Sequence, residues 1–110
     1  IINLEALGAG DLCYLEREGS MKQKVCSPRM KRFIRKAIQA SSVDLGGAMV
    51  NWRESPASYA MKHRAQAVTI AGMDGNKPAL MGEADDVIEN IDEQSLTRAA
   101  DFVVELLKNI

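Results

Sequence analysis

The sequence has little of several residue types that mark whole classes of protein. It holds one histidine, two cysteines and three prolines, and aromatic residues make up only 5% of its 110 positions. Two cysteines cannot build a disulfide-rich scaffold, and so little proline argues against a collagen-like or proline-rich disordered chain. No apolar run approaches the roughly 20 residues of a membrane helix, and no basic-then-apolar leader opens the chain. We therefore expect neither a membrane protein nor a secreted one.

Charge of one sign is also lacking, because 14 Lys+Arg face 15 Asp+Glu and the net charge is −1. Such a balance provides no net field to attract nucleic acid or anionic lipid, so we expect neither as a partner. What is present is ordinary for a globular domain: 46% hydrophobic and 26% charged residues. Cys13 and Cys26 are expected to be buried or free thiols, which favours the cytoplasm while leaving the compartment open.

Strands and helices are predicted to alternate along the chain. Apolar, β-branched or alternating runs predict strands at Ile1–Leu7, Leu12–Glu16, Val43–Val50 and Ala67–Ala71. Ser27-Pro28 and Ser55-Pro56 each combine an N-cap residue with a first-turn proline, and Asp92 caps a last helix. The first helix is predicted to bury Met30, Phe33, Ile34, Ala37, Ile38 and Ser41, and the last Leu96, Ala99, Ala100, Val103, Leu107 and Ile110.

This alternation predicts an α/β fold, a layered and largely parallel sheet with helices packed on it. Residues 1–110 are expected to form a single α/β domain or the carboxyl-terminal part of a larger catalytic domain, since the chain opens directly on Ile1-Ile2-Asn3-Leu4. The irregular connection over residues 73–91 follows the clearest strand. Because α/β sheets hold ligands beyond the carboxyl ends of their strands, we expect a site there.

Few residues stand out as candidates for chemistry. Glu5 ends a buried strand, so its carboxylate needs a structural partner such as arginine or a metal ion. The acidic residues 83–89 suit either a solvated segment before a helix or a hard cation. His63 suits either a helix-capping or a catalytic role, and Gly8-x-Gly10 is typical of a turn more than of a dinucleotide site. The five cations of the first helix are expected to form a solvated face.

Three stretches in this order are similar to the carboxyl-terminal part of the zinc exopeptidases related to bacterial leucine aminopeptidase and glutaminyl cyclase. Ile2–Gly8 resembles that family's strand motif Asn-Leu-Asp, which is followed by two apolar residues and Gly. Ser55–Ile70 resembles the family's helix and strand that end in Gly-Ile-Pro-Ala-Val. Asp86–Asp92 resembles the family's segment Asp-Thr-x-Glu-Asn-Ile-Asp.

The resemblance implies a zinc-dependent, aminopeptidase-like hydrolase acting on a peptide or aminoacyl substrate, in which a metal-bound water attacks. It implies that Glu5 is a metal ligand in place of the family's aspartate, with Glu83 and Asp86 lining the site. Gly82 stands where the family has a ligand histidine, so the chain by itself is expected to be inactive. Its partner would be the remainder of the domain or a second copy. The alternative is a non-catalytic binding or scaffold module that keeps the fold without the metal.

Overall fold

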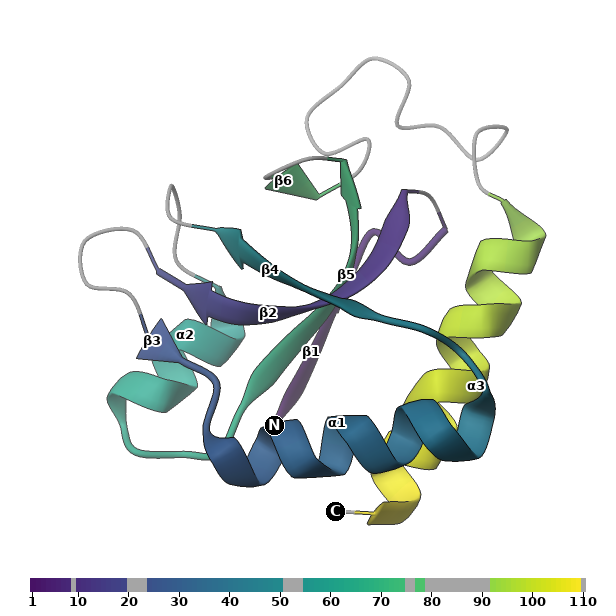
Figure 1. The fold of residues 1–110 in the computed structure, drawn as a ribbon. Coiled ribbons are helices and arrows are strands. Elements are labelled where there is room, and N and C mark those ends of the chain that lie inside the picture. The colour runs from purple at the N-terminus through teal and green to yellow at the C-terminus, as the bar shows by residue number, and fades with distance from the viewer. Residues whose placement is uncertain (9, 20–23, 51–54, 75–76, 79–91, 110) are drawn as a thin grey trace.

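The computed structural model describes residues 1–8, 10–19, 24–50, 55–74, 77–78 and 92–109 (Figure 1). Strands and helices follow one another along the chain in this order: β1 (Ile2–Glu5), β2 (Asp11–Glu18), β3 (Lys24–Val25), α1 (Pro28–Ser41), β4 (Gly46–Val50), α2 (Pro56–Lys62), β5 (Val68–Asp74), β6 (Lys77–Pro78) and α3 (Glu93–Asn109). The structure therefore confirms a mixed α/β fold.

The sheet is not largely parallel, contrary to the expectation from the sequence. Among the described strands, β1 with β5 and β2 with β4 are parallel pairs. The pairs of β2 with β3, β2 with β5 and β5 with β6 are antiparallel. The alternation of strands and helices led to the wrong prediction, because it gives the order of the elements along the chain and not which strands become neighbours in the sheet. β5 is central, with β1 on one side and β2 on the other.

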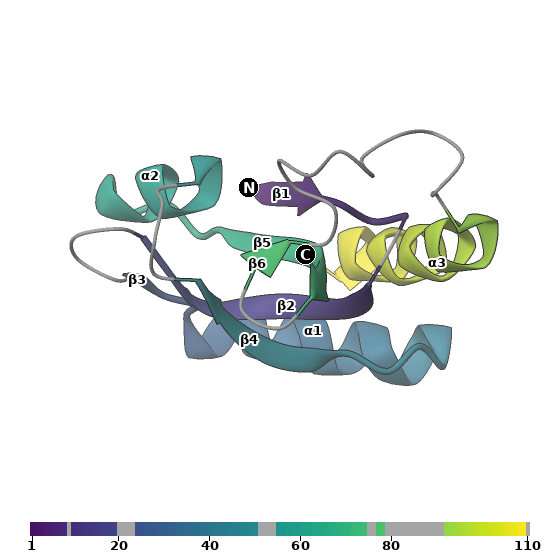
Figure 2. The same cartoon turned by 90° about the horizontal axis from the view of Figure 1, so that it is seen from above.

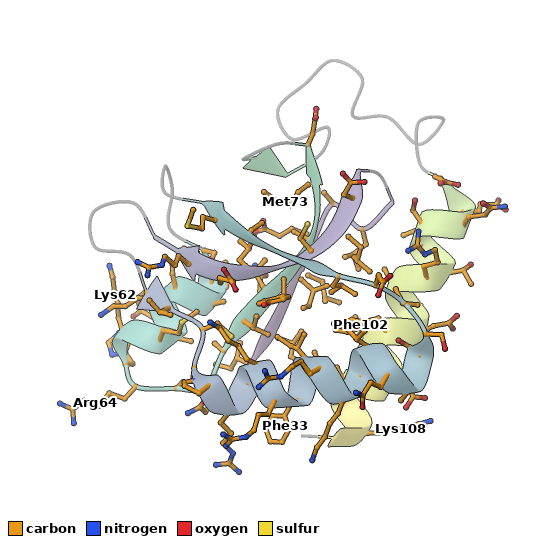
Figure 3. The ribbon with its side chains drawn as sticks, in the orientation of Figure 1. Phe33, Lys62, Arg64, Met73, Phe102 and Lys108 are labelled. Atoms are coloured by element: carbon orange, nitrogen blue, oxygen red, sulfur yellow. The ribbon has the colours of Figure 1, made fainter. Side chains whose placement is uncertain are left out.

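Helices α1 and α3 pack against each other and cover one face of the sheet (Figures 1 and 2). The main core lies between them and the strands and includes Ile34 from α1, Val68 and Ile70 from β5, and Phe102 and Leu106 from α3. Figure 3 shows Phe102 inside this layer, whereas Lys62, Arg64 and Lys108 extend outward. Successive strand residues face opposite ways, so Thr69 points to the other face, where α2 lies.

Local signals set the helix starts as expected. The Ser27 hydroxyl accepts a hydrogen bond from the Met30 backbone N–H at 3.1 Å, and Pro28 occupies the first turn of α1. Helix α1 ends at Ser42, whose φ of 57° is left-handed. Its predicted apolar side is confirmed, because Met30, Ile34 and Ala37 are buried.

The buried face of α3 differs in part from the predicted one. Ala99 is buried as predicted, and Val103 packs partly buried against the core. Phe102 and Leu106 are buried as well, whereas Leu96, Ala100 and Leu107 are exposed, and Ile110 lies outside the described residues. Both sets recur at helical spacing, so the sequence pattern allowed two adjacent apolar stripes. The large Phe102 side chain fills the space between α3 and the sheet, which turns Leu107 to the outside.

Candidate functional site

Glu5 is the last residue of β1 and shares a sheet face with two polar neighbours. The parallel register pairs Asn3 with Thr69 and Glu5 with Ala71. Paired residues on adjacent strands project to the same face, and so do residues two apart in one strand. Asn3 Nδ2 lies 3.2 Å from Glu5 Oε1 and 3.2 Å from Thr69 Oγ1, donating toward both oxygens. The half-buried Glu5 carboxylate is thus held by an amide on its own strand.

A second carboxyl group, Glu18 at the end of β2, meets the same polar residues. It is only 1% exposed. Thr69 Oγ1 donates to Glu18 Oε1 at 2.8 Å, and the Ser55 hydroxyl donates to the same oxygen. Asn3, Glu5, Glu18, Ser55 and Thr69 form what we call the polar cluster.

Ser55 is positioned by the start of α2. Its hydroxyl accepts from the Ser58 backbone N–H at 3.0 Å, and the Ser58 hydroxyl accepts from the Ser55 N–H at 2.8 Å. This reciprocal capping box, followed by Pro56, fixes the first turn of the helix. The Ser55 hydroxyl therefore caps α2 and contacts Glu18 at the same time.

The surroundings of Glu18 in the polar cluster raise the pKa of its carboxyl above the ordinary value. Burial raises the pKa of the Glu18 carboxyl, and the charge of Glu5 raises it further, whereas the hydrogen bonds from Ser55 and Thr69 lower it. Within the described part of the chain, Glu18 Oε2 is buried without a hydrogen-bond partner. A neutral carboxyl tolerates such a position at far lower cost than a carboxylate.

The described residues do not build a zinc site by themselves. No group of three or more His, Cys, Asp or Glu side chains among them is placed to hold a metal ion. A catalytic zinc needs about three protein ligands, and the buried Glu18 already accepts two hydrogen bonds on one oxygen. Gly82, Glu83 and Asp86 lie outside the described residues, as does most of the connection over residues 73–91.

The other candidates have structural roles in the described structure. His63 is exposed and forms the C-cap of α2, with its ring 4.7 Å from the Tyr59 ring. Gly10 has a φ of 72°, which fits a turn. Cys13 and Cys26 are free thiols, and burial raises the pKa of Cys26 to about 11, so this thiol stays protonated and unreactive.

Glu18 is the part of the site that sequence reasoning missed. The second strand was expected to end at Glu16, which left Glu18 outside it, whereas β2 extends to Glu18. Its hydrogen-bond donors lie 37 and 51 positions further along the chain, so no local pattern pointed to its burial.

A scan against protein-family models finds no matching model, and a search of curated proteins finds no significant match. Of the helices in the described part of the chain, none is long and apolar enough to cross a membrane.

Proposed function

We propose that this chain is part of a zinc-dependent, aminopeptidase-like hydrolase and is inactive by itself. One observation carries the proposal: Glu5 ends a parallel strand, and its carboxylate is held by Asn3 from the same strand. In metal sites, hydrogen bonds of this kind orient carboxylate ligands. The carboxyl end of a strand next to a parallel neighbour is also where α/β sheets place their ligands.

In this proposal Glu5 supplies one zinc ligand, and residues outside the described part supply the others. Glu83 and Asp86 line the same site, Asp86 by orienting polar groups at its mouth. Asn3 fixes one oxygen of Glu5 and connects it through Thr69 to Glu18. The substrate is a peptide or an aminoacyl compound.

The edge of the sheet supports a partner that completes the domain. In the described sheet β1 is an outer strand, with β5 on one side only. Ile1 and Leu4 are 64% and 46% exposed. Parallel strands with exposed apolar residues are unusual at a free edge, so pairing with the remainder of the domain or with a second copy would bury them.

Zinc content tests this proposal directly. Native mass spectrometry of the protein in chelator-free buffer measures the zinc bound per chain. Since the chain by itself is proposed to be inactive, the substitution is made in the complete, zinc-binding domain. There we expect Glu5→Ala to lower zinc content and the release of amino acid from an aminoacyl p-nitroanilide. The matched control, Asp101→Asn, removes an exposed carboxylate on α3 and leaves both unchanged. Unchanged zinc content in Glu5→Ala overturns the role of Glu5.

The alternative is a non-catalytic binding or scaffold module without metal. The glycine at position 82 and the glutamate at position 5 favour it, because the family that the chain resembles has histidine and aspartate there. In that case excess zinc neither raises the melting temperature nor produces hydrolysis. Zinc-dependent stabilisation that is lost in Glu5→Ala rules this alternative out.

A further inference from the structure

A cavity of about 490 Å³ lies where the first turns of α3 face the ends of the central strands. Its walls come from the β1–β2 connection, the starts of β2 and β4, the end of β5 and α3. Glu5 is not part of its lining. Its volume falls within the range of about 300–1,000 Å³ that is common for small-molecule sites.

The cavity has an apolar wall and a gap at a glycine. Leu7, Leu12 and Leu45 contribute aliphatic side chains. At Gly46 no side chain enters the cavity, and a Cβ built there would meet nothing within 4 Å. The leucines therefore suit a small aliphatic group, and the missing side chain at Gly46 leaves room beside them.

Charged side chains of both signs stand around this apolar part. Asp11, at the start of β2, and Asp44, just before β4, both line the cavity, and both residues are exposed. Arg98 lines the cavity from α3. Among the described residues no ion pair or hydrogen bond engages the side chain of Asp11, Asp44 or Arg98, although all three line one cavity.

We infer that this cavity binds a small zwitterion with an apolar body, an amino acid or a dipeptide with an aliphatic side chain. The carboxylates that line the cavity suit an ammonium group, whereas a guanidinium suits a carboxylate through paired, charge-assisted hydrogen bonds. The leucine wall would take the aliphatic side chain. This site is independent of zinc and goes beyond the hydrolase proposed above.

The dipeptide Leu-Gly and its blocked forms test the inference. Binding is measured by ¹H–¹⁵N NMR titration of the 110-residue chain in buffer with EDTA, so that metal-dependent hydrolysis does not contribute. N-acetyl-Leu-Gly lacks the ammonium group and Leu-Gly amide lacks the carboxylate. We expect saturable binding of Leu-Gly, and a Kd about tenfold higher for each blocked form, as for the loss of one charged contact.

Variants locate the contact. The Arg98→Gln variant should bind Leu-Gly and Leu-Gly amide with the same Kd, because the partner of the carboxylate is gone. Arg32 is an exposed arginine on α1, and the Arg32→Gln variant should bind Leu-Gly with the Kd of the unmodified chain. Gly46→Val should fill the cavity and abolish binding. Equal Kd values for free and blocked dipeptides, an Arg98→Gln variant that keeps its preference for Leu-Gly, or no saturable binding at millimolar concentration would each overturn the inference. Because EDTA removes zinc, a negative result here leaves the role of Glu5 unaffected.

Discussion

The two faces of the sheet both bury apolar residues but differ in the polar groups that they bury. The face under α1 and α3 is aliphatic and aromatic, with Ile34, Ile70 and Phe102 fully buried. The opposite face carries the polar cluster, in which Glu18 is equally buried but depends on hydroxyl donors. Apolar burial is stabilising in itself, whereas a buried carboxyl group is tolerated only while its partners stay in place. The first face secures the fold, and the second is the one whose properties respond to solution conditions.

Removal of the largest core side chain should have the largest effect. Phe102→Ala leaves a cavity between α3 and the sheet, and we expect it to lower the free energy of unfolding by about 3–5 kcal/mol. Leu107→Ala is the matched control on the same helix, because Leu107 is 59% exposed, and its effect should stay within about 0.5 kcal/mol. Urea denaturation of both variants measures the difference. Similar losses in the two would mean that the buried side of α3 has been wrongly assigned.

A single substitution in the polar cluster should lower the free energy of unfolding less than Phe102→Ala does. Thr69→Val keeps nearly the same volume but removes the hydroxyl that links Asn3 to Glu18, and we expect a loss of about 1–3 kcal/mol. Thr97→Val is the control, because the Thr97 hydroxyl makes an exposed bond to Glu93 O at 3.0 Å, and its loss should be below about 0.5 kcal/mol. An unchanged free energy of unfolding in Thr69→Val would show that the polar cluster does not contribute to stability.

The smallest effect concerns pH. Because the pKa of Glu18 is raised above its ordinary value of 4.5, the folded state retains this proton more tightly than the unfolded state. Its contribution to stability is therefore complete below pH 4.5 and is lost as pH rises through the folded pKa. Glu18→Gln should show a weaker decline in melting temperature over this range than the unmodified chain, while the exposed Glu93→Gln should follow the unmodified chain. A decline that persists unchanged in Glu18→Gln would assign it to other groups.

Features determined by neighbours in the sequence were predicted well. The starts of α1 and α2 follow from Ser27-Pro28 and Ser55-Pro56, whose capping bonds span only three residues. The buried side of α1 was also predicted, because its cationic residues left only one apolar stripe.

Features determined by contacts between distant parts of the sequence were not predicted. The antiparallel pairing of β2 with β5 joins segments about sixty residues apart, and no residue pattern encodes strand direction. The choice between the two stripes of α3 depends on how Phe102 packs against the sheet. At the candidate site, the place of Glu5 at a strand end and its need for a polar partner were predicted, and its role as a metal ligand stays a prediction. Glu18 was missed because its donors come from β5 and the start of α2.

The Ser55 hydroxyl has a consequence for how the molecule opens. It accepts from the first turn of α2 and donates to Glu18 at the end of β2, so neither element can move away without breaking a bond that the other uses. Local unfolding in proteins occurs in cooperative units of this kind. We therefore expect helix α2, although only seven residues long, to open together with the sheet.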